Sequence, residues 1–272
     1  VSLFDLAWSA SGAARHMLRD HFRCHSDIAS YCSETFYGGR LFVRTEPSSL
    51  KAPKGQKPGL HWTNVTGPIE RASKGCRSHA EATALVDHLD ELIGNGDYKG
   101  TVGVVTPFAK QEELLVHMIE QRIPLERIHQ VDLRVGTSHK FQGDDRDVML
   151  ISLCYGADMP RNGAWFLQSS RELINVAVSR ARAVCQIFGN RDAALSCDIK
   201  HIAQLARHIG SEGQPSGNPR DLFESPWEER LYDALKVAGL EPIPQYRLSG
   251  RRLDFALIKG KIHLDIEVDG DS

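Results

Sequence analysis

The sequence has no long apolar run, no paired cysteine motif and almost no net charge. No stretch of about 18 or more apolar residues occurs, which argues against a membrane-spanning helix. The opening residues lack the charged, apolar and small-residue regions of a signal peptide, so a cytoplasmic location and no membrane partner are predicted. The six cysteines show no C-x-x-C spacing, and neither a disulfide framework nor a zinc site is indicated.

The formal net charge of -2 argues against a protein that holds nucleic acid by bulk positive charge. A domain that holds nucleic acid by bulk positive charge usually carries a strongly basic surface. Any contact of this chain with nucleic acid must therefore be local. With 272 residues and 41% hydrophobic content, the chain is long enough for one large core or for two domains of ordinary size.

The middle of the chain alternates between helix-like and strand-like patterns. Apolar residues at helical spacing predict helices over residues 77–93, 108–122 and 169–183. Short apolar runs predict buried strands over residues 101–106, 128–135, 148–153 and 184–188. Because a parallel sheet needs a crossover helix between its strands, this alternation predicts an α/β fold with a doubly wound parallel sheet.

Two segments of the chain have the composition of loops. Residues 42–76 carry lysines among proline and glycine, which predicts a solvated loop, with a nucleic-acid-contacting insertion as the alternative. Residues 210–219, with the sequence GSEGQPSGNP, concentrate turn formers and almost no apolar residues. We therefore predict a first domain over residues 1–210, a linker over 211–224 and a second domain over 225–272.

Two early segments carry side chains suited to phosphate. Arg23 lies in the segment HFRCHSDIASYCSETFYGGRL, and a planar, permanently charged guanidinium is a strong phosphate donor. Thr106 and Pro107 lie where the strand of VGVVTPFAKQ runs into a helix, and such strand ends face the ligand crevice of α/β sheets. The alternatives are a surface arginine before a helix and a turn that Pro107 merely rigidifies.

The stretch VGTSHKFQGDDRDVMLIS at residues 135–152 combines a hydroxyl, cations and a glycine. Thr137, His139 and Lys140 are suited to gripping phosphates without reading sequence. Gly143 lets the backbone approach a phosphate or a sugar without a Cβ clash. The alternative is an acidic turn between two strands. Further along, LINVAVSRARAVCQIFGN contains Arg180 and Arg182, which would point to different faces of the predicted helix.

In their order, these four segments resemble motifs of superfamily 1 nucleic-acid helicases of the nonsense-mediated-decay branch, namely the segment after motif III and motifs IV, V and VI. The resemblance implies that residues 1–210 form the second RecA-like motor domain. It also implies an arginine-finger role for Arg180 and contact of Arg23 with the γ-phosphate of ATP. Gln142, Gly143, Asp145 and Arg182 would then lie at the nucleotide, with Asp145 in the place of the family's glutamate.

The same resemblance implies partners and cofactors. Thr106, Pro107, Thr137, His139 and Lys140 would contact DNA or RNA, between which the sequence does not choose. No G-x-x-x-x-G-K-[ST] loop occurs, so the P-loop and the ligands of Mg²⁺ are expected on an upstream RecA-like domain. The chain is therefore expected to hydrolyse no ATP alone, and to act in an ATP-dependent helicase or translocase.

The tail from residue 225 resembles the start of PD-(D/E)XK nuclease domains related to very-short-patch repair endonucleases. A helix capped at Ser225 leads into two strand-like runs. A hairpin turn at residues 259–260 would place Asp254 near Asp265. The resemblance implies that Asp254, Glu267 and Asp269 bind Mg²⁺ or Mn²⁺ and catalyse phosphodiester cleavage, with Glu228 or Glu229 available to complete the cluster. The alternative is a docking module with a degenerate nuclease fold and exposed acidic positions.

Overall fold

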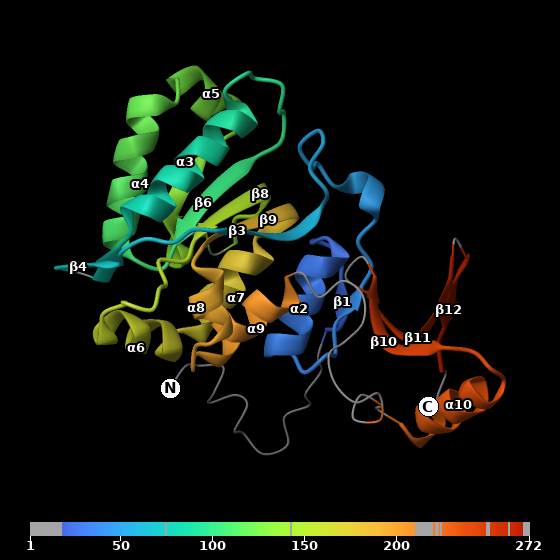
Figure 1. Ribbon diagram of the computed structural model, residues 1–272. Helices are drawn as coiled ribbons and strands as arrows, with labels where there is room; N and C mark the ends of the chain where they lie inside the picture. The colour runs from blue at the N-terminus through green and yellow to red at the C-terminus, as the bar shows by residue number, and fades with distance from the viewer. Residues whose placement is uncertain are drawn as a thin grey trace, which may run out of the picture.

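In the computed structural model, a central sheet of five parallel strands forms the larger part of the molecule (Figure 1). The structure describes residues 18–73, 75–141, 143–209, 220, 223, 225–248, 251–260 and 262–268. The strand order is β3-β9-β8-β6-β7, and every neighbouring pair is parallel. The strands are β3 (Gly59–Asn64), β6 (Val102–Thr106), β7 (Arg134–Thr137), β8 (Arg146–Ser152) and β9 (Ala181–Gly189). The predicted α/β parallel sheet is confirmed.

Both faces of this sheet are covered by helices, because the strands are apolar on both sides. Val148 and Leu150 of β8 pack on one face against α3 (His79–Ile93) and α4 (Ala109–Arg122). Met149 and Ile151 point to the other face and belong to a second core. The helices on that side are α2 (Ser26–Phe36), α7 (Arg171–Ser179), α8 (Arg191–Leu195) and α9 (Lys200–His208).

Three sequence predictions need correction. Residues 128–135 do not form a strand, because α5 (Leu125–Gln130) starts directly after Pro124 and β7 begins only at Arg134. The helix predicted over 169–183 is shorter, because α7 ends at Ser179 and β9 begins at Ala181, and a further helix, α6 (Arg161–Ser169), precedes it. Residues 42–76 are not simply a loop, because they supply the edge strand β3, whose residues 59–64 pair with β9.

Short elements complete the first part of the chain. A two-stranded parallel ladder joins β1 (Asp20–His21) to β2 (Phe42–Val43), so the ends of the segment containing α2 lie together. A hairpin of β4 (Glu70–Ala72) and β5 (Gly75–Arg77) projects beside α6. Two 3-10 turns, η1 (Pro47–Ser49) and η2 (Ser138–Phe141), lie in connections. The second of these follows β7 directly.

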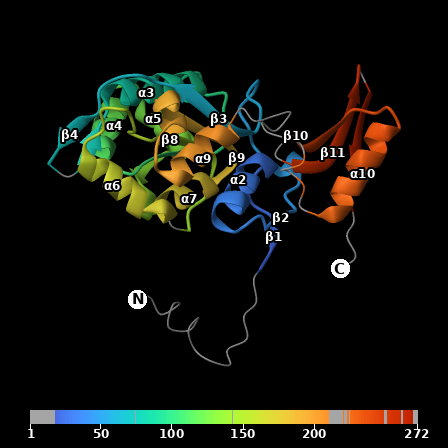
Figure 2. The same ribbon diagram turned by 60° about the horizontal axis from the view of Figure 1, so that its bottom comes forward.

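The tail forms a small unit beside the larger one (Figure 2). Its helix α10 (Pro226–Val237) begins as predicted, with the Ser225 hydroxyl accepting from the amide of Glu228. The helix packs on an antiparallel sheet of β10 (Pro242–Leu248), β11 (Arg251–Lys259) and β12 (Ile262–Ile266). The rings of Tyr232 and Phe255 lie 6.2 Å apart between helix and sheet. The linker prediction falls mostly on residues outside those described, so the domain boundaries stay a prediction.

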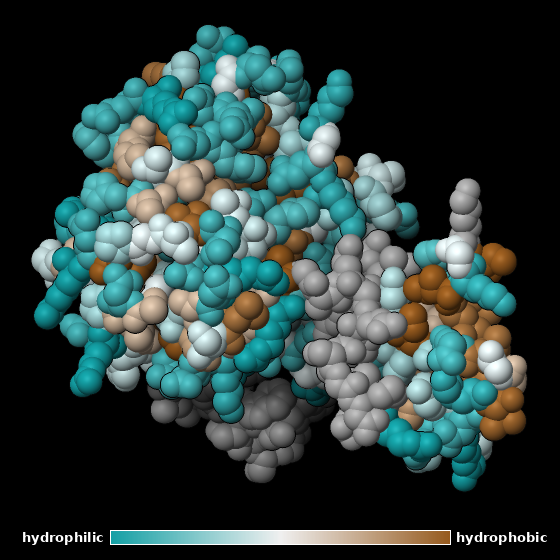
Figure 3. All heavy atoms as spheres, viewed as in Figure 1, coloured by the Kyte–Doolittle hydropathy of each residue, from teal (hydrophilic) through white to brown (hydrophobic). Residues whose placement is uncertain are grey.

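The outer edge of the tail sheet exposes apolar side chains. Ile262 and Leu264 of β12 are 71% and 54% exposed, and Figure 3 shows hydrophobic residues gathered on this part of the molecule. The hairpin of β11 and β12 is confirmed, but its turn lies one residue later than predicted, because Lys259 pairs with Ile262. Asp265 consequently lies opposite Ala256 rather than Asp254.

Candidate nucleotide and nucleic-acid sites

The predicted site residues of the larger unit lie at two opposite edges of the central sheet. Asp145 and Arg180 each directly precede a strand, β8 and β9, and so lie at the amino edge. Thr106 and Thr137 are the last residues of β6 and β7 and lie side by side in register at the carboxyl edge. The chain passes from the second edge to the first between Thr137 and Asp145.

At the amino edge, three arginines surround the carboxylate of Asp145. Arg23 Nε lies 2.8 Å from Oδ2, and Arg180 Nη1 lies 3.0 Å from Oδ1. Arg182 Nη2 is more distant, 4.0 Å from Oδ2. We call these four residues the arginine cluster. One negative charge faces three positive ones, so the cluster has an excess of positive charge.

Backbone contacts hold the arginine cluster in place. Arg180 ends helix α7 as its C-cap, and its carbonyl oxygen accepts a hydrogen bond of 2.9 Å from the amide of Arg146. The carbonyl oxygen of Arg182 accepts one of 2.7 Å from the amide of His25. Because Arg182 belongs to β9 and not to the helix, it projects from a strand, which corrects the expectation of two helix faces.

The segment that carries Arg23 is fixed by its neighbours. The amide of Cys24 donates to His21 Nε2 at 3.1 Å, and the Cys24 thiol donates to the carbonyl oxygen of Ser179 at 3.4 Å. Burial, with the nearby charge of Arg23, lowers the pKa of His21, so Nε2 keeps its lone pair for this bond. Burial raises the pKa of Cys24 to about 12, so its sulfur remains a neutral thiol beside the cluster.

The cluster has donor capacity that its internal ion pairs do not use. Among the described residues, buried Nε of Arg180 finds no hydrogen-bond partner, although a buried polar atom of this kind is normally satisfied. The side chains of Arg180 and Arg23 are 16% and 38% exposed, so they can be reached from outside. A phosphate fits this arrangement, since its oxygens accept several guanidinium hydrogens.

At the carboxyl edge, a groove of about 550 Å³ lies between the β4–β5 hairpin, the ends of β6 and β7, and α6. We call it the α6 groove. Three predicted nucleic-acid residues line it: Pro107, Thr137 and His139. Two others do not. Thr106 is fully buried, with its hydroxyl accepting from the amide of Phe108 at 3.5 Å, and Lys140 Nζ pairs with Glu112 Oε1 at 2.5 Å.

Sequence reasoning missed part of the groove wall. Trp165 and Phe166 of α6 line it, and Trp165 is 68% exposed. The helix escaped prediction because Pro160 and Gly163 interrupt its apolar pattern, although the adjacent aromatic pair was a readable signal. Of the remaining predicted residues, Gly143 has φ +83°, which favours glycine, and Gln142 lies outside the described residues.

The tail carboxylates that the structure describes are hydrogen-bonded within the tail. Asp254 Oδ2 accepts a 2.7 Å hydrogen bond from the amide of Val268, and Glu228 is buried and accepts from Gln245 Nε2 at 3.0 Å. Among the described residues, no group of three or more histidine, cysteine, aspartate or glutamate side chains is placed to hold a metal ion. Asp269 lies outside those residues, so the set of Asp254, Glu267 and Asp269 stays a prediction.

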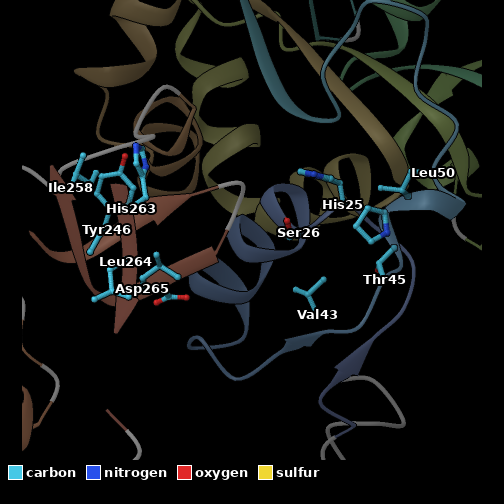
Figure 4. Close-up of a pocket in the computed structure, with 13 residues that line it drawn as sticks. His25, Ser26, Val43, Thr45, Leu50, Tyr246, Ile258, His263, Leu264 and Asp265 are labelled. Atoms are coloured by element: carbon cyan, nitrogen blue, oxygen red, sulfur yellow. The ribbon is translucent and has the colours of Figure 1, made fainter. Parts of the chain in front are cut away.

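A second cavity, of about 530 Å³, separates the tail sheet from the larger unit. His25 and Thr45 line one wall, and Tyr246, His263 and Asp265 line the other (Figure 4). Its lining is mixed in charge and is shared between two parts of the chain.

Of the helices that the structure describes, none is long and apolar enough to span a bilayer.

Comparison with known proteins places the chain in a family. Residues 1–192 match the family model described as "AAA domain", so the chain belongs to this family. It is 25% identical over 233 residues to the DNA replication ATP-dependent helicase/nuclease dna2 of Schizosaccharomyces pombe. The alignment covers 75% of this chain and 16% of that protein. It is 31% identical over 209 residues to the DNA replication ATP-dependent helicase/nuclease JHS1 of Arabidopsis thaliana, and this alignment covers 70% of this chain and 15% of that protein.

A third relative has a different name. Regulator of nonsense transcripts 1 of Dictyostelium discoideum is 27% identical over 251 residues, covering 89% of this chain and 18% of that protein. The chain spans 15% to 18% of the length of these three relatives. The resemblance to superfamily 1 helicases is confirmed at the level of the family. The family match ends before residue 225, so the nuclease resemblance stays a prediction.

Proposed function

We propose that this chain is the second motor domain of an ATP-dependent nucleic-acid helicase or translocase. The observation that carries the proposal is the arginine cluster, in which Asp145 holds Arg23 and Arg180 together at one edge of the sheet. A first RecA-like domain with a P-loop would complete the site and bring ATP with Mg²⁺. Relatives named as ATP-dependent helicases support this assignment.

In this proposal each residue of the cluster has its own role. Arg180 donates to the γ-phosphate and neutralises the charge that grows on it as the terminal bond breaks. Arg23 supplies a second planar donor to the same phosphate. Asp145 touches both guanidiniums and fixes their orientation, which makes it a positioning residue. Arg182 is more exposed and more distant, and it supports the charge of the cluster.

The α6 groove would bind the nucleic-acid strand along which the motor moves. Thr137 and His139 offer a hydroxyl and an imidazole to backbone phosphates without reading base sequence. DNA and RNA both satisfy this chemistry. A cytoplasmic location stays a prediction.

The test is ATP turnover in the protein that carries the P-loop domain, with saturating nucleic acid. Arg180→Ala is expected to lower kcat by about three orders of magnitude, as loss of an arginine finger does. Arg182→Ala is expected to do less.

A matched control for this test is Arg122→Ala. Arg122 is an exposed arginine on α4 that also pairs with two carboxylates, Asp87 and Asp90, but contributes to neither candidate site. Near-normal turnover of the Arg180 variant with saturating nucleic acid would refute the arginine-finger role of Arg180.

A further inference from the structure

Trp165 is an exposed aromatic ring on the wall of the α6 groove. It is 68% exposed, while Gly163 and Leu167 on the same helix are buried. Helix α6 is thus anchored by one side and presents a large indole on the other. An indole on the wall of a groove offers a ligand more apolar contact area than almost any other side chain.

The wall that carries Trp165 is held rigidly. The rings of Phe166 and Phe108 pack with their centroids 5.5 Å apart, which ties α6 to the start of α4. Gly163 allows close approach to β5, since a Cβ at this position would lie 2.6 Å from Cys76 Sγ. The ring is therefore presented from a fixed helix and not from a mobile loop, which lowers the entropy cost of binding.

The polar part of the groove lining is basic or neutral. Arg71 and His139 contribute the basic groups, and Asn162 and Thr137 contribute neutral ones. None of the described residues that line the groove is acidic, although the whole chain carries more acidic than basic residues. This local charge favours a polyanion over a neutral or basic peptide.

A basic groove with an aromatic ring on its wall suits a particular ligand. Bases stack on such rings with little sequence preference, while the phosphates follow the positive groups. A base can stack on a protein ring only when it is unpaired, so a duplex does not satisfy the arrangement.

We propose that Trp165 is a base-stacking platform that selects single-stranded nucleic acid in the α6 groove. This proposal rests on the proposed function, because it assumes that the groove holds the nucleic-acid track. It adds a base-contacting residue outside the helicase-like motifs. One base lies on the indole while Arg71 and His139 face the neighbouring phosphates.

The test measures binding of fluorescein-labelled oligo-dT and oligo-U to the whole chain by anisotropy, at one fixed salt concentration. Trp165→Ala is expected to weaken both by about tenfold to a hundredfold, since stacking on an aromatic ring contributes about 1–3 kcal/mol per base. Trp165→Phe should recover most of the affinity. A duplex of the same length should bind more weakly than the single strand and respond little to Trp165→Ala.

The matched control is Trp227→Ala, which removes an indole that is 58% exposed but lies on α10 of the tail. Photocrosslinking of an oligonucleotide containing 5-bromouracil should label Trp165 in the unaltered chain. If the wild type binds single strands and Trp165→Ala binds them equally well, the stacking proposal is overturned and the proposed function stands. If the wild type binds neither strand nor duplex, the proposed function fails as well.

Discussion

Asp145 Oδ1 lies 3.0 Å from Arg180 Nη1, and Oδ2 of the same carboxylate lies 2.8 Å from Arg23 Nε. The two arginines are far apart in the sequence and meet on one side chain. Because a carboxylate accepts from two guanidiniums at once, it fixes their separation as well as their orientation. Removing it would leave both cations partly buried and without their shared partner.

The first prediction follows from this sharing. Asp145→Asn in the protein that carries the P-loop domain should lower kcat, because an amide neither holds two cations by charge nor fixes their geometry. Asp145→Glu should retain more turnover, since the carboxylate is kept. The measurement is steady-state ATP hydrolysis with saturating nucleic acid. A rise in KM with unchanged kcat would instead mean that Asp145 acts in ground-state binding.

A second prediction concerns the chain without a partner domain. It should bind ATP weakly and hydrolyse none, because the cradle of P-loop amides and its lysine supply most phosphate contacts. Isothermal calorimetry with ATP and Mg²⁺ measures this directly. Micromolar affinity together with turnover would contradict the proposal that the ATP site is completed by another domain.

The third prediction concerns Glu81, a buried carboxylic acid between helix α3 and the central sheet. Glu81 of α3 is 1% exposed, and its carboxylate accepts from the Ser152 hydroxyl at 2.8 Å and the Cys154 amide at 2.7 Å. Burial raises its pKa to about 7, against the opposing effect of these hydrogen bonds. The folded state therefore binds a proton more tightly than the unfolded chain.

The pH dependence of stability follows from that raised pKa. The stabilising contribution of the protonated Glu81 is fully present below the unfolded pKa of about 4.3 and is lost as pH rises through about 7. Glu81→Gln should raise the free energy of unfolding at pH 8 by roughly 1–3 kcal/mol and flatten the slope between these values. Urea unfolding at several pH values measures it, with Glu91→Gln, an exposed position on the same helix, as the control.

The fourth prediction separates two roles of Asp254. Asp254→Asn keeps an oxygen that can accept from the Val268 amide, so the tail sheet should stay folded. If Asp254 also belongs to a metal site, the same change should abolish binding of Mn²⁺, measured by electron paramagnetic resonance. Equal Mn²⁺ binding by the wild type and by Asp254→Asn, or none by either, would contradict the metal interpretation.

Much of the fold could be predicted because its pattern is local. The buried runs of β6 and β8 and the helical spacing of α3 and α4 depend on residues close together in the chain. Strand β3 could not be found this way, because its sequence GLHWTN is half polar and becomes a strand only through pairing with β9. Helix α6 contains Gly163, whose place is explained by its tertiary packing, since a Cβ there would meet Cys76 and Met159.

For the candidate site, too, one part could be predicted from the sequence and another part could not. Family resemblance pointed to Arg23, Asp145 and Arg180 separately, but their meeting on one carboxylate is a tertiary property. Thr106 was expected to face a ligand, whereas the structure uses its hydroxyl internally. In the tail, the turn lies one residue later than expected, so the partner of Asp265 is Ala256 and not Asp254, two positions away on the same face.

The segment from Thr137 to Asp145 connects the two candidate sites, and this connection has a thermodynamic consequence. Its first end lines the α6 groove and its second end belongs to the arginine cluster, so a shift of this segment alters both places. Linkage requires such an effect to be reciprocal. By whatever factor a strand in the groove changes the affinity of the cluster for phosphate, phosphate must change the affinity for the strand by the same factor. Under the proposed function, the coupling free energy between nucleic acid in the groove and the nucleotide phosphate at the cluster is therefore the same in both directions.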